Sequence, residues 1–209
     1  MLFKKMIKRI VDVIGAVVLI LLLFPIFVLL YLVILISMGN PVVFKQYRPG
    51  KNEVLFPILK FRTMSQACSA DGILLPDNQR ITKLGALLRK TSLDELPSLL
   101  NVIKGEMSFI GPRPLLIQYL PYYTDEERIR FSMRPGITGL AQVSGRNNLD
   151  WDTRLSMDVY YVENYSMTLD AIILFRTILH VFTGKDIAVD TDTVESFLDK
   201  ERATSNGAK

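Results

Sequence analysis

Residues 13–38 read VIGAVVLILLLFPIFVLLYLVILISM, an uncharged apolar run that decides how this chain of 209 residues is built. As one straight helix the run would be about 39 Å long, which exceeds a hydrocarbon core of about 30 Å. It therefore predicts a membrane anchor over residues 1–40. The remainder is long enough to bury a core of its own, so we expect one compact domain over residues 41–184 and a polar tail over residues 185–209.

Pro25 lies near the middle of the apolar run. A proline inside a helix removes one backbone hydrogen bond and clashes with the preceding turn. Each half is then about 12 residues, or about 18 Å, which is too short to cross a bilayer alone. Lysine and arginine flank both ends, and the positive-inside rule places both flanks in the cytoplasm. Two interpretations stay open: a re-entrant helix hairpin broken at Pro25, and one crossing helix with a tolerated kink.

Composition narrows the choice of partners. The net charge is +4, and basic residues gather on either side of the apolar run, which suits an anionic lipid surface. No basic helix alternates with aromatic residues, so the sequence argues against a nucleic-acid partner. A single cysteine excludes an intramolecular disulfide, and a single histidine cannot build a histidine-rich metal site.

The rest of the chain predicts a mixed α/β fold that is mostly helical. Residues 42–47 and 54–63 are rich in β-branched and aromatic side chains and are separated by a proline–glycine turn, which predicts two short paired strands. Helical spacing of apolar residues follows in several segments. These predicted helices cover residues 81–90, 93–103, 151–162 and 167–182, and the last is apolar enough to lie in the headgroup region as an interfacial helix.

Two adjacent carboxylates, Asp94 and Glu95, begin the second of these predicted helices. One interpretation is purely structural, because Ser92 and Glu95 match a capping box and acidic residues favour a first turn. The same position also suits chemistry, since a helix N-terminus keeps a carboxylate ionised and attracts phosphate. Asp94 could then attack phosphorus, while the pair offers the few oxygen ligands that Mg²⁺ takes beside substrate phosphates.

Arginine and lysine residues supply candidates for phosphate binding. Guanidinium presents a planar fork that matches phosphate oxygens, and several arginines stand beside proline or glycine in irregular segments. Two further cations alternate at the end of the second predicted strand, so we expect them on one side of it. The predicted phosphate-binding residues are Lys60, Arg62, Arg113, Arg134 and Arg146.

Four motifs in order resemble the bacterial sugar transferase family, the monotopic phosphoglycosyl transferases. They are KFRTM at 60–64, SLDELP at 92–97, SFIGPRP at 108–114 and RPGITG at 134–139. The resemblance runs from the basic N-terminus to about residue 182. It implies transfer of a sugar 1-phosphate from a UDP-sugar to undecaprenyl phosphate, with release of UMP.

The same resemblance assigns roles to residues. It implies Asp94 as the nucleophile, Glu95 as its partner, Arg113 as a phosphate ligand, and Lys60 and Arg146 as contributors. Mg²⁺ is the implied cofactor, bound at the two carboxylates. A nucleotide-sugar hydrolase and a non-catalytic membrane scaffold are the competing hypotheses.

The resemblance also bears on the anchor. It favours the hairpin broken at Pro25, although family members often carry serine before this proline and Phe24 stands here. It implies a location at the bacterial inner membrane with the catalytic domain on the cytoplasmic face. The identity of the sugar and the oligomeric state, a homodimer included, stay open.

Overall fold

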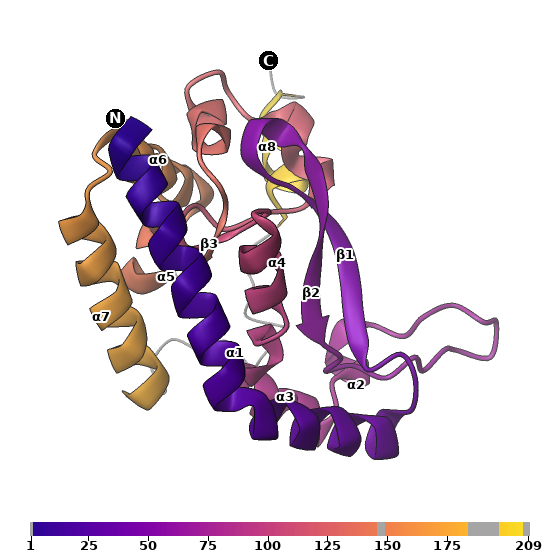
Figure 1. Cartoon of the computed structure of the whole chain (residues 1–209). Coiled ribbons are helices and arrows are strands. Elements are labelled where there is room, and N and C mark those ends of the chain that lie inside the picture. The colour runs from indigo at the N-terminus through magenta and orange to yellow at the C-terminus, as the bar shows by residue number, and fades with distance from the viewer. Residues whose placement is uncertain (1, 146–148, 184–196, 207–209) are drawn as a thin grey trace.

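The computed structural model of the chain describes residues 2–145, 149–183 and 197–206. It is a mixed α/β structure in which helices predominate (Figure 1). The α-helices are α1 (Leu2–Met38), α2 (Asp77–Arg80), α3 (Lys83–Lys90), α4 (Ser98–Lys104), α5 (Leu140–Ser144), α6 (Trp151–Glu163), α7 (Met167–Thr183) and α8 (Leu198–Asn206). The strands are β1 (Val43–Pro49), β2 (Leu55–Phe61), β3 (Ser108–Ile110) and β4 (Gly136–Thr138). Short 3₁₀ helices are η1 (Lys51–Glu53), η2 (Leu93–Glu95), η3 (Ile117–Tyr122) and η4 (Glu127–Ser132).

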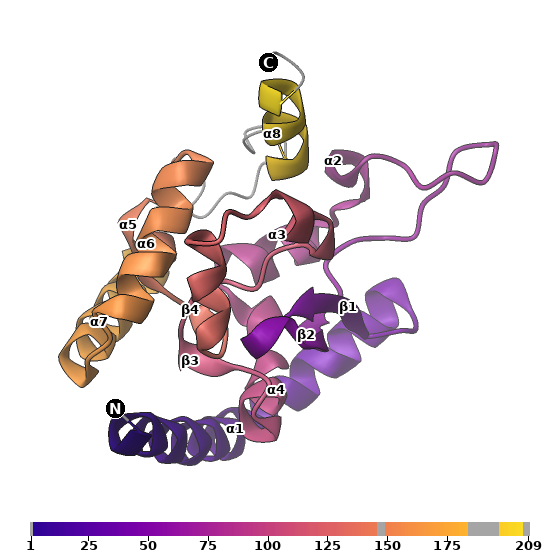
Figure 2. The ribbon, with the colours of Figure 1, turned by 90° about the horizontal axis from the view of Figure 1, so that it is seen from above.

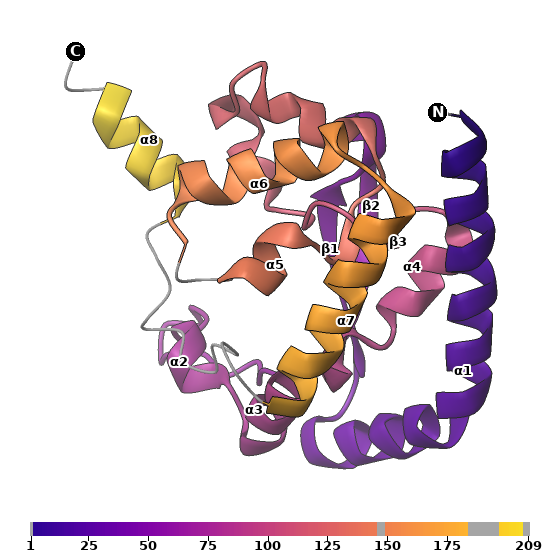
Figure 3. The same cartoon turned by 90° about the vertical axis from the view of Figure 1, so that its left-hand side faces the viewer.

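Helix α1 bends sharply about halfway along its length, so its two arms run in different directions (Figures 1 and 3). Pro25 is the proline inside α1, and a proline is the usual cause of so sharp a kink. By length and composition α1 is apolar enough to cross a membrane, and most of its large apolar side chains are exposed. The bend is the feature that the hairpin and the kinked crossing helix have in common.

The first arm of α1 is tied to the rest of the domain by three charged residues. Lys8 donates a 2.7 Å hydrogen bond to Asp170 on α7, and Asp12 accepts one of 3.2 Å from the backbone N–H of Phe109. Arg9 donates to two carbonyls at the end of α4. These three charged side chains thus fasten the first arm of α1 to the rest of the domain.

Two small sheets position the loops between the helices. Strands β1 and β2 form the predicted antiparallel pair, with Val43 opposite Phe61 and Pro49 opposite Leu55, which confirms the prediction from alternation and the turn. Strands β3 and β4 form a parallel pair that the sequence did not reveal. The backbone just after β3 packs directly on β4, since a Cβ on Gly136 would lie 2.2 Å from the backbone nitrogen of Gly111. Only glycine fits there.

The predicted helices of the C-terminal half are confirmed as α6 and α7. The segment predicted as a polar tail contains α8, whose Leu198 is fully buried against Trp151 and Tyr119. Seen from above (Figure 2), α1 lies along one side of the molecule and α8 on the opposite side. Helix α4 packs on α1 and β2, and the loops around its N-terminal end carry the candidate site.

Candidate active site

Asp94 and Glu95 lie in η2, the short turn between α3 and α4. Ser92 precedes this turn with a left-handed backbone, at φ 56°, and its side chain makes no capping hydrogen bond. An N-cap serine normally has an extended backbone that aims its hydroxyl at the following N–H groups. The predicted capping box is therefore wrong, and the carboxylates are free to face other parts of the fold.

Glu95 is held by two cations from distant segments. Its Oε1 accepts a 2.6 Å bond from Nζ of Lys60 at the end of β2, and a 3.3 Å bond from Nη2 of Arg113. Burial by itself would raise the pKa of Glu95, but the charges of Lys60 and Arg113 outweigh it and lower this pKa to about 2. Glu95 is therefore ionised at neutral pH and orders the two cations beside Asp94.

Asp94 is the more deeply buried carboxylate, with 8% of its surface exposed. Burial and the neighbouring charge of Glu95 raise its pKa, while Lys60, Arg89 and Arg113 act in the opposite direction. Among the described residues, none donates a hydrogen bond to its carboxylate, so its oxygens stay available to another group. A carboxylate that is shielded from water, unshared and bordered by cations suits nucleophilic attack on a phosphoryl centre.

Sequence reasoning missed Arg89. It stands in the last turn of α3, and its Nε donates a 3.1 Å hydrogen bond to Oγ1 of Thr63, just after β2. Like Arg113, it lowers the pKa of Asp94 through its positive charge, although Arg89 precedes Asp94 in the sequence and Arg113 follows it. Its position five residues before Asp94 could have pointed to it. It also lies at the end of a predicted helix, however, where the helix dipole favours a cation without any role in a site.

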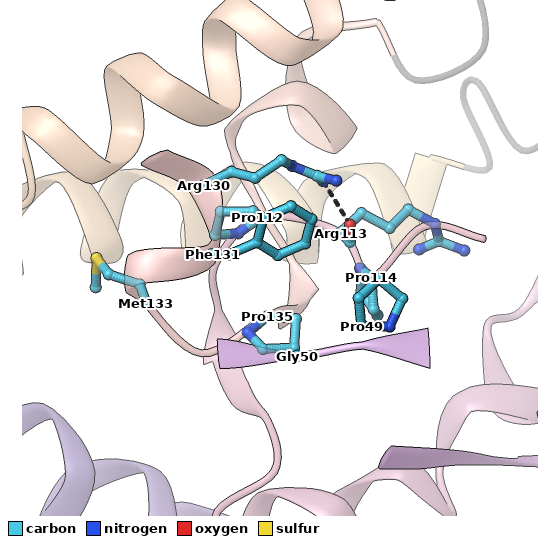
Figure 4. Close-up of a pocket in the computed structure, with 9 residues that line it drawn as sticks. All are labelled: Pro49, Gly50, Pro112, Arg113, Pro114, Arg130, Phe131, Met133 and Pro135. Carbon is cyan, nitrogen blue, oxygen red and sulfur yellow. Dashed lines mark hydrogen bonds between the residues drawn. The ribbon is translucent and has the colours of Figure 1, made fainter. Parts of the chain in front are cut away.

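Arg113 stands between two prolines in the loop after β3, and its side chain is 45% exposed. The loop borders a small cavity that is also lined by Pro49, Gly50, Phe131, Met133 and Pro135 (Figure 4). On the inner side, Nη2 of Arg130 donates a 2.7 Å hydrogen bond to the carbonyl oxygen of Arg113 (Figure 4). The backbone is thus held from within while the guanidinium reaches outward to Glu95.

The structure does not bring Arg62 to the carboxylate pair. Although it follows Lys60 by two residues, its guanidinium donates to the carbonyls of Met38 and Pro41, where α1 ends and the chain turns toward β1. The alternation that predicted both cations on one side fails because β2 ends at Phe61. Substrate binding by Arg62 stays a prediction that this geometry does not support.

Arg134 also lies apart from the pair, at the opposite end of α4. Its Nε donates a 2.7 Å hydrogen bond to the carbonyl of Gly105, beside the carbonyls that Arg9 binds. A phosphate-binding role for Arg134 is likewise unsupported by the geometry. Arg146 falls outside the described residues.

The donor chemistry of the pair fits Mg²⁺ but no closed metal cage. No group of three or more histidine, cysteine, aspartate or glutamate side chains gathers among the described residues. Mg²⁺ is usually bound by one or two carboxylates, with water and substrate phosphates completing its shell. Asp94 and the second carboxylate oxygen of Glu95 could supply that minimal set.

The site combines two carboxylates with surrounding cations in a domain joined to a long apolar helix, and comparison with known proteins gives its family. Residues 3–184 match the family model described as bacterial sugar transferase. The chain therefore belongs to the bacterial sugar transferase family and is a transferase enzyme.

Individual relatives agree with this assignment. The uncharacterized sugar transferase EpsL of Bacillus subtilis is 46% identical over 180 residues, covering 86% of this chain and 89% of EpsL. A UDP-glucose:undecaprenyl-phosphate glucose-1-phosphate transferase of Caulobacter vibrioides is 38% identical over 191 residues, covering 84% of this chain and 70% of that protein. An undecaprenyl-phosphate galactose phosphotransferase of Salmonella typhimurium is 37% identical, covering 83% of this chain but 40% of that protein.

Proposed function

We propose that this enzyme transfers a sugar 1-phosphate from a UDP-sugar to undecaprenyl phosphate and releases UMP, through a covalent phosphosugar intermediate on Asp94. The observation that carries the proposal is the buried, unshared carboxylate of Asp94 with the charges of Lys60, Arg89 and Arg113 around it. The relatives from Caulobacter vibrioides and Salmonella typhimurium, whose names include undecaprenyl phosphate, support the choice of acceptor.

In the first step, a carboxylate oxygen of Asp94 attacks the β-phosphorus of the UDP-sugar. The bond from that phosphorus to the bridging oxygen breaks, and UMP leaves with the electron pair. Lys60 and Arg113 are positioned to accompany the developing negative charge, because Glu95 already holds both at the edge of the site. Bound Mg²⁺ would supply further neutralisation of the diphosphate, with Asp94 and Glu95 as its protein ligands.

In the second step, a phosphate oxygen of undecaprenyl phosphate attacks the phosphorus held on Asp94. The acyl phosphate bond breaks, the polyprenol diphosphate sugar forms, and the carboxylate of Asp94 is regenerated. Burial of Asp94 supports this sequence because a shielded acyl phosphate is protected from water until the lipid acceptor arrives. Transfer to water instead would make the enzyme a nucleotide-sugar hydrolase.

The acceptor is lipid-soluble, and the apolar surfaces suit that chemistry. Helix α7 is joined to the first arm of α1 through Lys8 and Asp170 and exposes large apolar side chains, among them Phe175 at 62%. With the bend of α1, this favours a monotopic arrangement in which α1 enters and leaves the bilayer by one face as a re-entrant hairpin. We place the catalytic domain on the cytoplasmic face of the bacterial inner membrane, where both substrates can meet.

The test is UMP release by the detergent-solubilised enzyme with Mg²⁺, undecaprenyl phosphate and a panel of UDP-sugars. We expect one donor to give UMP that depends on the lipid, and Asp94→Asn to abolish it while the protein stays folded. Glu106→Gln, a change of a carboxylate that bonds to Asn101 outside the site, is the matched control. Without lipid, the first step should release at most one UMP per enzyme molecule. Continued turnover without lipid would identify a hydrolase, and release that survives in Asp94→Asn would exclude Asp94 as the nucleophile.

A further inference from the structure

A buried ion pair lies directly beneath the loop that carries Arg113. Arg130 of η4 and Asp158 of α6 meet at 2.7 Å, with side chains that are 1% and 3% exposed. Neither touches the carboxylates of the site. Burying two charges is costly, and such a pair is often no more stabilising than apolar residues of similar volume. Its presence therefore calls for a role beyond stability.

The pair is built to hold one backbone group. Nη2 of Arg130 donates to Asp158 and also to the carbonyl oxygen of Arg113 at 2.7 Å, while Nη1 donates to the hydroxyl of Tyr123 at 3.0 Å. The guanidinium also lies 5.4 Å from the ring centres of Tyr123 and Phe131. With its plane fixed by a carboxylate and two rings, Arg130 offers the Arg113 carbonyl one donor in one direction.

Arg113 needs such a constraint more than the other cations around Asp94. Lys60 projects from a strand and Arg89 from a helix, so regular hydrogen bonding fixes the backbone of both. Arg113 belongs to neither kind of element, and the prolines on either side restrict φ but contribute no N–H to hold the loop. Its contact with Glu95 is also the longer one, 3.3 Å against 2.6 Å for Lys60.

We infer that Arg130 is a positioning residue for the transfer reaction, which fixes the Arg113 backbone so that the guanidinium meets the substrate phosphates, with Asp158 orienting Arg130 in turn. The inference rests on the proposed function for its kinetic part. Its structural part, that Arg130 orders the loop after β3, stands independently.

The kinetic test is a double-mutant cycle on lipid-dependent UMP release. We expect Arg130→Gln to lower kcat/KM by about 10- to 100-fold, the scale of a small misplacement of a phosphate-binding group. In an Arg113→Ala background the same change should cost less than about threefold, because the group it positions is already gone. Equal losses in both backgrounds would overturn the inference.

Two further variants keep the test decisive. Arg128→Gln is the matched control, because Arg128 lies on the same η4 helix and donates to the carbonyl of Leu120 and to Glu53 instead of Arg113. It should leave kcat/KM within about threefold of the wild type. If Arg130→Gln fails to fold because it leaves Asp158 charged and unpaired, Arg130→Gln combined with Asp158→Asn removes both charges and takes its place in the cycle.

Hydrogen–deuterium exchange measures the structural part without substrate. We expect Arg130→Gln to speed exchange in the segment 110–116 and to leave α4 and β2 as protected as in the wild type. Faster exchange at 110–116 with no kinetic coupling would confine Arg130 to a structural role and overturn the positioning role. If Arg113→Ala itself left UMP release unchanged, the proposed role of Arg113 would fail, whatever exchange showed for Arg130.

Discussion

The two ends of helix α4 use the same kind of residue for opposite purposes. At its N-terminal end, Lys60 and Arg113 bind Glu95 and leave the carboxylate of Asp94 unshared. At its C-terminal end, Arg9 and Arg134 donate hydrogen bonds to the backbone carbonyls of residues 102, 103 and 105. The acceptor nearest to each arginine therefore decides its role. An arginine beside a carboxylate of the site can bind substrate, whereas one beside the carbonyls of a helix end stabilises the fold.

Among the substitutions considered below, Glu95→Gln should cause the largest loss of activity at the N-terminal end of α4. The change keeps the shape of the side chain but removes the charge that orders Lys60 and Arg113 beside Asp94. We expect kcat for lipid-dependent UMP release to fall at least about 100-fold, in the range for loss of an acid–base or charge-ordering group. A fall of less than about threefold would mean that Glu95 does not organise the site.

Arg113→Gln is expected to give the next largest loss of activity. It removes one charge-assisted donor from the phosphates, a hydrogen bond worth about 1.5–3 kcal/mol, and the corresponding loss of kcat/KM is about 10- to 100-fold. The melting temperature should stay close to that of the wild type, because the Arg113 side chain is nearly half exposed. A large drop in melting temperature with normal activity per folded molecule would show that Arg113 stabilises the fold and does not bind substrate.

Arg134→Gln is the same substitution at the other end of α4 and should behave in the reverse way. The carbonyl of Gly105 loses its donor, which costs about 1–2 kcal/mol in the free energy of unfolding. For a chain of this size that corresponds to a melting temperature lower by about 2–8 °C. Activity per folded molecule should remain within about threefold. Loss of activity at an unchanged melting temperature would instead support the predicted role of Arg134 in phosphate binding.

The smallest expected effect is on the pH dependence of stability, which should differ between substitutions at the two ends of α4. The pKa of Glu95 is lowered to about 2 from its ordinary 4.5, so its ion pairs stabilise the fold fully above pH 4.5 and cease to do so as the pH falls toward 2. Without metal or substrate, the gap in melting temperature between wild type and Glu95→Gln should therefore be constant near neutrality and narrow in acid.

Arg134→Gln is the control for that measurement. Neither an arginine nor a backbone carbonyl titrates in this range, so its gap from the wild type should not depend on pH between about 3 and 7. A gap for Glu95→Gln that is equally flat would show that the Glu95 ion pairs add nothing to stability.

Sequence reasoning succeeded where a pattern is local. The strands β1 and β2 follow from alternation and their turn, the bend of α1 agrees with Pro25, and α6 and α7 follow from helical spacing. The carboxylate pair and its partners Lys60 and Arg113 were also singled out. The parallel pairing of β3 with β4 was not, because three-residue strands carry no readable period.

The arginines could not be sorted from sequence. Arg113 and Arg134 both stand beside proline in irregular segments, yet one reaches Glu95 and the other a helix end. Arg89, in a predicted helix, and Arg130, in a segment with no predicted element, were not singled out, yet the first borders Asp94 and the second holds the Arg113 loop. Each distinction depends on contacts between segments far apart in the chain, which no local spacing encodes.

The fastening of the first arm of α1 has a practical consequence for anyone preparing this enzyme. Asp170, which binds Lys8, also accepts a 2.6 Å hydrogen bond from Tyr161, whose hydroxyl reaches the carbonyl of Ile110 at the end of β3. Deleting α1 to obtain a water-soluble fragment would remove the Lys8 partner of the buried Asp170, which is linked through Tyr161 to Ile110, three residues before Arg113. Helix α1 is thus linked through buried hydrogen bonds to the strand that precedes the Arg113 loop, and purification should keep it, in detergent or a lipid disc.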